Sequence, residues 1–217
     1  MRADLSAVTY RLGASLYVAL TNQCNAVSLL KSRGPGFAMP SASGFEMLSF
    51  EPTAEEVVSA VSAAIRTQST TGVVFAGAGE PLMRLRVLEE CAAMLRESLA
   101  DGLPPLRLST NGLVPAGEAS EVAWRLSKAN LHSVSVAIAT ANPEQYDSLM
   151  QPQELRYSPA FSLPLGHAQV CKFVEACTSE GLAVECTAVA APGVDMSAAR
   201  QLAEQYGATF RERAYFP

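Results

Sequence analysis

The chain has 217 residues, of which 49% are hydrophobic and 17% charged, and its formal net charge at pH 7 is −5. This composition is typical of a globular protein and excludes an intrinsically disordered chain. The acidic balance argues against nucleic-acid binding, which needs Lys and Arg opposite the phosphates. No apolar run approaches the roughly 20 residues of a membrane-spanning helix, so we expect a soluble protein without membrane insertion.

Short β-rich runs alternate with longer segments of helical period along the chain. The predicted strands are residues 16–20, 72–76, 106–109, 133–138, 183–189 and 209–215. Thr53 and Glu56 have the spacing of a capping box, which predicts that a helix begins there. Helical apolar stripes follow in residues 57–65, 88–99, 122–129, 170–177 and 199–206, the last with Gly207 as its expected C-cap.

This alternation predicts right-handed βαβ units with parallel strands. We therefore expect an α/β fold, a partial (β/α)6 TIM-like barrel, with a doubly wound sheet as the alternative. Residues 1–217 are expected to form a single domain, with residues 1–14 as a candidate flexible arm. Residues 25–50 and 151–166 are the expected long loops, and long loops in compact domains are often functional.

The five cysteines stand at positions 24, 91, 171, 177 and 186, and no CxxC motif is present. This spacing favours neither a disulfide scaffold nor a zinc ribbon and indicates a reducing compartment, either cytoplasm or an organelle matrix. Cys91, Cys171 and Cys177 fall on apolar helical stripes, so we expect them in the core. Cys186 lies within a strand and is a weak candidate ligand.

The segments that directly follow the predicted strands contain the polar and glycine residues of interest, because ligands bind at the carboxyl ends of parallel strands. They are residues 21–25, 77–81, 110–112 and 139–143. Taken singly, Gly-Pro and Asn-Gly sequences are also common in ordinary turns. His132 and His167 belong to no metal-binding spacing, and we expect surface or capping roles for them.

Taken together, the motifs are more specific than each alone. In order they are LTNQC at 20–24, RGPGF at 33–37, FAGAGEPLMR at 75–84, RLSTNG at 107–112 and FRERAY at 210–215. This series resembles the radical SAM superfamily, and within it the TatD-associated radical SAM proteins. The resemblance implies the six-stranded partial barrel of the radical SAM core. It also implies a [4Fe–4S] cluster held by three cysteines in a CxxxCxxC motif, with S-adenosylmethionine (SAM) bound to the fourth iron.

The resemblance also implies which residues contact SAM. The segment Gly77, Ala78, Gly79 and Glu80 matches the motif that contacts the methionine amino group, mainly through its backbone. Asn111 and Ser135 match the strand ends that contact the ribose and the carboxylate. For Glu80, capping of a helix N-terminus is the alternative. Glu144 and Asp147 are further carboxylates on these loops, for which we expect a solvated position.

The cluster motif departs from the family at two of its three cysteines. Cys24 matches the first ligand, whereas Ser28 and Lys31 stand at the second and third. Clusters of this type need thiolate donors, and a serine hydroxyl is much harder to deprotonate than a thiol. A lysine must first lose its proton, which costs about 4–5 kcal/mol at pH 7. We therefore expect no iron–sulfur cluster, while SAM binding stays open.

Four functions remain, and no residue is assigned a catalytic role. The first is a non-catalytic scaffold, a subunit of a larger assembly with protein partners. The second is a radical SAM enzyme with unusual cluster ligation or a cluster shared with a partner. The third is a SAM-binding protein without redox chemistry. The fourth is an unrelated α/β barrel enzyme acting on a phosphorylated substrate, for which the glycines at 77 and 79 would contact phosphate.

Overall fold

The computed structural model describes residues 5–115, 117–153, 155–158, 161–163 and 165–217. By its internal contacts the chain divides into two compact units. The first unit consists of Met1–Cys24, Ala38–Ser109 and Ala129–His132, and the second of Asn25–Phe37, Thr110–Lys128 and Ser133–Pro217. Each unit is described separately below, and the expectation of a single domain stays a prediction.

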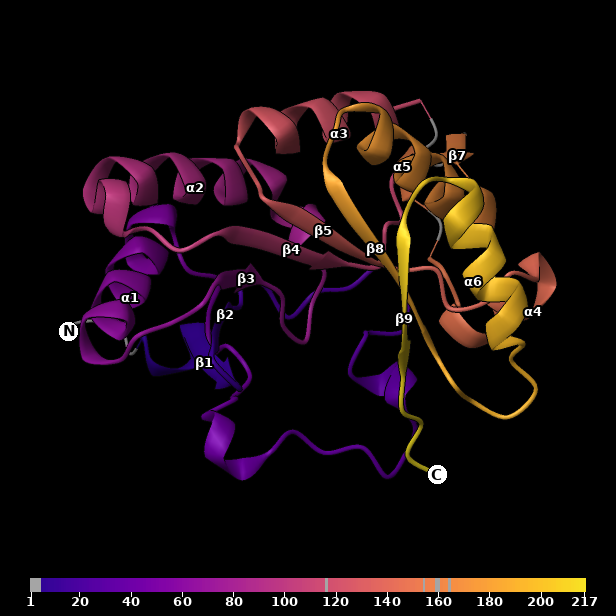
Figure 1. Cartoon of the computed structure of the whole chain (residues 1–217), viewed down its shortest axis with the longest axis horizontal. Helices are drawn as coiled ribbons and strands as arrows, with labels where there is room; N and C mark the ends of the chain where they lie inside the picture. Colours follow the sequence, from indigo (N-terminus) through magenta and orange to yellow (C-terminus); the bar gives the residue numbers. More distant parts are fainter. Residues whose placement is uncertain (1–4, 116, 154, 159–160, 164) are drawn as a thin grey trace. The chain divides into compact units, whose positions relative to one another are not determined.

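The first unit is built on four strands in the order β1-β2-β3-β4 (Figure 1). Strand β1 (Thr9–Leu12) pairs antiparallel with β2 (Ser15–Val18). β2, β3 (Val73–Phe75) and β4 (Leu106–Thr110) are parallel, with Leu16 opposite Val73 and Val73 opposite Leu106. All three residues of β3 are buried, as expected for a parallel strand that is covered on both faces.

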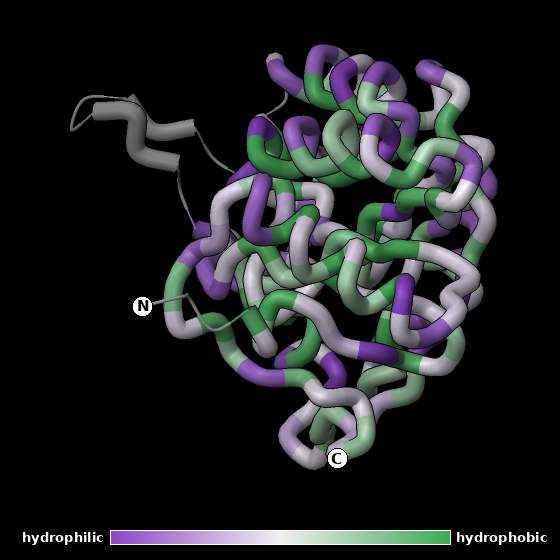
Figure 2. The backbone as a smooth tube through the Cα atoms, turned by 90° about the vertical axis from the view of Figure 1, so that its left-hand side faces the viewer, coloured by the Kyte–Doolittle hydropathy of each residue, from purple (hydrophilic) through white to green (hydrophobic). Residues whose placement is uncertain are grey.

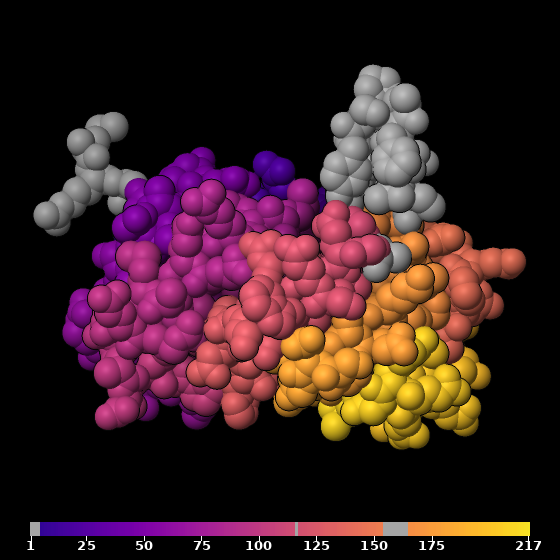
Figure 3. All heavy atoms as spheres, turned by 90° about the horizontal axis from the view of Figure 1, so that it is seen from above, coloured from indigo at the N-terminus to yellow at the C-terminus, as the bar shows by residue number. Residues whose placement is uncertain are grey.

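Two helices of the first unit, α1 (Ala54–Thr67) and α2 (Leu85–Leu99), pack side by side (Figure 1). In the space-filling view of Figure 3, the purple and magenta atoms of this part of the sequence adjoin. Helix α1 begins with the predicted capping box, in which the Thr53 hydroxyl accepts from the Glu56 N–H and the Glu56 carboxylate accepts from the Thr53 N–H. The apolar stripes of both helices are buried. Figure 2 shows how hydrophobic (green) and hydrophilic (purple) positions alternate along the backbone.

The second unit contains three parallel strands in the order β5-β8-β9. They are β5 (Ser133–Ala137), β8 (Ala183–Val189) and β9 (Thr209–Arg213). A separate antiparallel hairpin consists of β6 (Leu155–Ser158) and β7 (Phe161–Leu163). The helices are α3 (Ala119–Lys128), α4 (Pro143–Met150), α5 (His167–Ser179) and α6 (Met196–Gln205).

The core of the second unit lies where α5 contacts β5 and β8. Val134 and Val136 of β5, Cys186 of β8 and Phe173 and Val174 of α5 are all 0% exposed. In each unit, then, parallel strands alternate along the chain with helices that cover them, which is the α/β arrangement expected.

The predicted strands and helices are all present, with bounds that differ by a few residues. Strands β1, β6 and β7 and helix α4 were not predicted. Residues 9–12, which we expected in the N-terminal arm, form β1, in which Tyr10 is buried, as is the preceding Val8. Helix α4 follows β5, and the β6–β7 hairpin lies within the expected loop 151–166. In the part of the chain that the structure describes, no helix has the length and apolarity to cross a membrane.

Candidate functional site

The segment after β3 packs directly on the segment after β2. The Glu80 N–H donates to the carbonyl oxygen of Gln23 at 2.8 Å. A Cβ atom at Gly79 would lie 2.4 Å from the Thr21 carbonyl oxygen and 2.5 Å from that of Gln23, closer than real Cβ atoms come. Glycine at 79 is therefore required by the close approach of two loops of this chain.

Glu80 is 2% exposed, and its carboxylate accepts a hydrogen bond of 3.0 Å from the Leu82 N–H. It is thus the N-cap of the short 3-10 helix Pro81–Arg84, as the alternative from the sequence predicted. Gly77 lies against Ala19, where a Cβ would approach the Ala19 Cβ to 3.2 Å, and Ala78 is half-buried. A contact of this segment with SAM stays a prediction.

Thr21 and Arg84 form a polar network that ties the segment 48–52 to the end of β2. The Thr21 hydroxyl donates to the Glu51 carboxylate at 2.6 Å. The Arg84 guanidinium donates to the carbonyl oxygens of Leu20 at 2.9 Å and Pro52 at 2.8 Å, and it lies 3.7 Å from the Glu51 carboxylate. The motif residues Thr21 and Arg84, which sequence reasoning did not single out, thus fasten neighbouring backbone.

The three positions of the cluster motif fall in different surroundings. Cys24 is half-buried at the end of a segment of the first unit. In the second unit, the Ser28 hydroxyl accepts from the Lys31 N–H at 3.4 Å, and the Ser32 N–H donates to the Ser28 carbonyl at 2.9 Å. The turn continues with the Gly34 N–H donating to the Lys31 carbonyl at 3.2 Å. Ser28 and Lys31 therefore belong to a turn that is closed by its own backbone, and the Lys31 side chain is exposed.

Asn111 is 1% exposed and forms a closed set of hydrogen bonds with Asn25 and Leu113. Its Nδ2 donates to Asn25 Oδ1 at 2.8 Å, and its Oδ1 accepts from the Leu113 N–H at 2.9 Å. Asn25 Nδ2 in turn donates to the Leu113 carbonyl at 3.1 Å. Asn25, which sequence reasoning did not single out, thereby joins the segment after β2 to the segment after β4.

Ser135 lies on β5, half-buried, and its hydroxyl donates to the Glu185 carboxylate at 3.3 Å. The same carboxylate accepts from Arg211 of β9, with Nε 2.8 Å and 2.9 Å from its two oxygens. The three residues form a polar ladder across neighbouring strands β5, β8 and β9. A contact of Ser135 with SAM stays a prediction.

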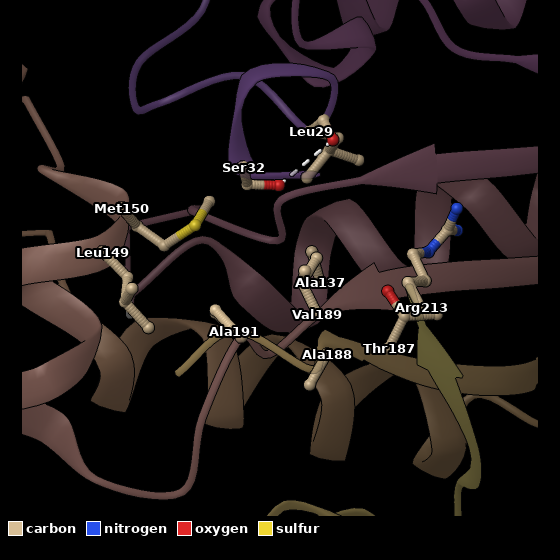
Figure 4. Close-up of a pocket in the computed structure, with 11 residues that line it drawn as sticks. Leu29, Ser32, Ala137, Leu149, Met150, Thr187, Ala188, Val189, Ala191 and Arg213 are labelled. Carbon is tan, nitrogen blue, oxygen red and sulfur yellow. Dashed lines mark hydrogen bonds between the residues drawn. The ribbon is translucent and has the colours of Figure 1, made fainter. Parts of the chain in front are cut away.

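A small, mostly apolar cavity of about 50 Å³ lies at the carboxyl ends of β5, β8 and β9 (Figure 4). One wall comes from Leu29 and Ser32. The remaining lining residues come from the strand ends and the end of α4, and they are Ala137, Ala139, Leu149, Met150, Thr187, Ala188, Val189, Ala191 and Arg213. This is the edge at which parallel α/β folds bind ligands.

The other four cysteines are buried. Burial raises the pKa of the Cys91, Cys177 and Cys186 thiols to about 12 in each case, and it also raises the pKa of Cys171. A buried thiol that keeps its proton is a poor metal ligand. Among the residues that the structure describes, no group of three or more His, Cys, Asp or Glu side chains is placed to hold a metal ion.

Of the two histidines, His132 is exposed as expected, but the expectation fails for His167. His167 is 8% exposed, and its Nε2 donates to the Thr140 carbonyl at 2.8 Å. Its ring also packs edge-on against buried Tyr146. His167 is the first residue of α5, and it is buried because this end of the helix packs against the loop that contains Thr140. The spacing of histidines in the sequence does not indicate this contact. Glu144 and Asp147 are exposed on α4, as predicted.

Solved structures with the same fold include the radical S-adenosylmethionine methyltransferase TsrM from Kitasatospora setae, with a TM-score of 0.55 and 15% identity, over 91% of this chain and 34% of that chain. SuiB from Streptococcus suis, bound to the precursor peptide SuiA, matches with a TM-score of 0.65 and 12% identity, over 94% of this chain and 40% of that chain. The protein anSMEcpe with bound AdoMet matches with a TM-score of 0.60 and 13% identity, over 92% of this chain and 52% of that chain. Methylornithine synthase (PylB) matches with a TM-score of 0.59 and 11% identity, over 95% of this chain and 55% of that chain.

This chain thus spans about half the length of these solved chains or less. At such identities the likeness establishes the fold, which is the partial barrel of the radical SAM core. No curated protein matches the sequence. The sequence model of the radical SAM superfamily matches residues 38–205, well over half of the sequence, and the chain therefore belongs to the radical SAM superfamily.

Proposed function

We propose that this member of the radical SAM superfamily is a non-catalytic scaffold, a subunit of a larger assembly, which does not bind a [4Fe–4S] cluster. The observation that carries the proposal is the donor set, with Cys24 as the one thiol and with Ser28 and Lys31 at the other two ligand positions. A cluster of this type needs thiolates, and an exposed ammonium group repels iron instead of binding it. The residues present do not fit the group.

The structure of the loop supports the proposal independently of the donor count. The Ser28 hydroxyl is used as an acceptor within its own turn, and the turn is closed by backbone hydrogen bonds at 2.9 Å and 3.2 Å. Gly79 likewise packs against the backbone of Thr21, and the Asn111 side chain donates to Asn25, so both motif positions make contacts within the chain. Retention of the surrounding motifs is therefore compatible with loss of the cluster, since these motifs also hold the loops together.

We further propose that the chain is closest to the TatD-associated subgroup. The order of LTNQC, RGPGF, FAGAGEPLMR, RLSTNG and FRERAY from residue 20 to residue 215 supports this assignment. Within that subgroup the chain would be a variant with a degenerate CxxxCxxC motif.

The experiment that tests the proposal is an iron and sulfide count after anaerobic reconstitution, with an ultraviolet–visible spectrum. We expect far less than one cluster for each chain. The combination Ser28→Cys with Lys31→Cys restores the CxxxCxxC spacing from Cys24 and serves as the positive control. Stoichiometric iron in the unaltered protein would overturn the proposal and support a radical SAM enzyme with unusual ligation.

Two further measurements separate the remaining alternatives. Calorimetric titration with SAM distinguishes a SAM-binding protein without redox chemistry from a scaffold, for which we expect no binding at millimolar SAM. Release of 5′-deoxyadenosine under a strong reductant distinguishes an enzyme that shares a partner's cluster from a scaffold. For a scaffold we expect neither signal, and we expect the protein to elute together with other proteins when it is isolated from its own cells.

A further inference from the structure

The loop Asn25–Phe37, here called the lid loop, covers the cavity at the ends of β5, β8 and β9. Figure 4 shows Leu29 and Ser32 of this loop on one side and Ala188 and Ala191 on the other. The Ser32 hydroxyl donates to the Leu29 carbonyl at 3.1 Å, which keeps this wall folded. The cavity volume of about 50 Å³ is well below the roughly 150 Å³ that accommodates one benzene ring.

The lid loop is attached at its first residues to the segment that follows α4. The Val27 N–H donates to the Met150 carbonyl at 2.7 Å, and the Gln153 N–H donates to the Asn25 carbonyl at 2.8 Å. Asn25 and Ala26 are buried. This end of the loop is thus held by main-chain hydrogen bonds that do not depend on any side chain.

The other end of the lid loop is held by residues 214–217, here called the strap. The Arg33 Nε donates to the Ala214 carbonyl at 2.8 Å. The Phe216 N–H donates to the Arg33 carbonyl at 2.8 Å, and the Gly36 N–H donates to the Phe216 carbonyl at 3.1 Å. The rings of Phe37 and Phe216 lie 5.4 Å apart, and the Arg33 guanidinium lies 4.8 Å and 5.3 Å from their centres, within the range of a cation–π contact.

Two glycines of the RGPGF motif permit this close approach. A Cβ at Gly34 would lie 2.1 Å from the Phe216 carbonyl oxygen, and a Cβ at Gly36 would lie 2.4 Å from the Pro217 oxygen. Gly34 also has a φ of +104°, which other residues rarely adopt. The glycines of the RGPGF motif thus leave room for the strap backbone, and the hydrogen bonds pair polar groups of the loop with those of the strap.

We propose that the strap latches the lid loop over the cavity, so that the cavity opens to ligands only when the strap is released. This latch rests on the proposed function, because in a protein without a cluster other contacts must hold the loop in place. The contacts with the strap do so. With the lid loop in place, the volume of about 50 Å³ is smaller than a nucleoside. Displacement of the loop would expose the apolar side chains of Ala137, Val189 and Ala191 to a small apolar group.

The test is amide hydrogen exchange, read by mass spectrometry, in the protein without added iron or SAM. In Arg33→Ala, which removes the hydrogen bond from Nε to the Ala214 carbonyl, we expect exchange across the lid loop to rise about tenfold, the factor that corresponds to one net hydrogen bond. Phe216→Ala keeps its backbone hydrogen bonds but loses the ring contacts with Phe37 and Arg33, so we expect exchange to rise there as well. Exchange in α1, which belongs to the other unit, should stay as it was. Arg86→Ala is the matched control, because Arg86 is 87% exposed on α2 and should leave both segments unchanged.

Gly36→Ala tests the same latch from the side of the loop and leaves every strap residue in place. It should raise exchange in the lid loop and in the strap together. In addition, a cysteine introduced as Ala137→Cys, at the half-buried end of β5 that lines the cavity, should react with maleimide faster when Phe216→Ala is present.

Unchanged lid-loop exchange in both Phe216→Ala and Gly36→Ala would overturn the latch, whatever the iron content proves to be. Exchange that rises equally in α1 and in the lid loop would overturn it as well, since that outcome indicates general unfolding. Iron bound in stoichiometric amount, by contrast, would overturn the proposed function while the exchange data still report on the strap.

Discussion

The side-chain amides of Asn25 and Asn111 are joined by a hydrogen bond of 2.8 Å between two residues that are 6% and 1% exposed. They lie 86 positions apart in the sequence. Each amide also bonds to the backbone of Leu113, so that the donors and acceptors of the two side chains are used within the chain.

Asn111→Ala should destabilise the protein by about 2–6 kcal/mol. It leaves Asn25 Oδ1 and the Leu113 N–H buried without their present partners, and each such loss costs about 1–3 kcal/mol. Asn111→Asp keeps the acceptor for Leu113 but places a buried carboxylate oxygen against Asn25 Oδ1, so we expect a loss at least as large at pH 7. Urea unfolding followed by circular dichroism measures both. A normal unfolding midpoint for Asn111→Ala would contradict the structural role and favour a role limited to ligand contact.

Gly79→Ala should destabilise the first unit, because its Cβ would lie 2.4 Å from the Thr21 carbonyl oxygen. Overpacking of this kind costs about 1–3 kcal/mol. Gly102→Ala is the control, since nothing lies within 4 Å of the Cβ position there. Thermal unfolding of the two variants should therefore differ, with a lower midpoint for Gly79→Ala only. Equal midpoints would indicate that the loops at residues 21–23 and 79–80 move apart freely.

Arg84→Ala should cost about 2–4 kcal/mol, because its guanidinium donates to the backbone carbonyls of Leu20 and Pro52 and such charge-assisted bonds are among the stronger ones. The loss of stability in Arg84→Lys should be smaller than in Arg84→Ala but measurable, since an ammonium group cannot reproduce the planar fork of a guanidinium. Arg86→Ala, which removes only an exposed helix pair with Glu90, should change the stability by less than about 0.5 kcal/mol. Chemical unfolding at fixed pH compares the three, and equal losses for Arg84→Ala and Arg86→Ala would contradict the network.

The stability of the protein should fall at alkaline pH. Burial raises the pKa of Cys91, Cys177 and Cys186 to about 12, above the roughly 8.5 of a thiol in the unfolded chain. The unfolded state therefore releases these protons first, so the stability is constant below about pH 8.5 and is lost as the pH rises from there towards 12. Each thiol contributes a slope of at most about 1.4 kcal/mol per pH unit.

Urea unfolding at a series of pH values measures this slope. Cys91→Ala removes one of the three thiols, so its stability should fall less steeply above about pH 8.5, even though the variant starts from a lower value. An unchanged slope in this variant would show that the Cys91 thiol is not protected from ionisation.

The sequence predicts those parts of the fold whose signals are local. The capping box at Thr53 and Glu56 fixes the start of α1, and the apolar run of β3 is buried on both faces, because neighbouring residues alone decide both features. The left-handed Gly207, with a φ of +71°, follows the end of α6 for the same reason. The order of the motifs also predicts the superfamily, which the family match confirms.

The rest depends on partners that are distant in the sequence. Nothing near Asn25 indicates that its amide meets Asn111, and nothing near Arg33 indicates a strap at Ala214. Strand β1 is short and has one buried side chain in four, so its pairing with β2 carries little periodic signal. Helix α4, with eight residues, begins at Asn142-Pro143, a sequence that also suits a turn.

The turn at residues 28–34 closes on its own carbonyl groups, between Ser32 and Ser28 and between Gly34 and Lys31. If the protein binds no cluster, as we propose, this turn should form without delivery of iron or sulfide by assembly proteins. The amount of folded protein in a cell should therefore be the same in iron-poor and iron-rich medium, and it should survive purification in air.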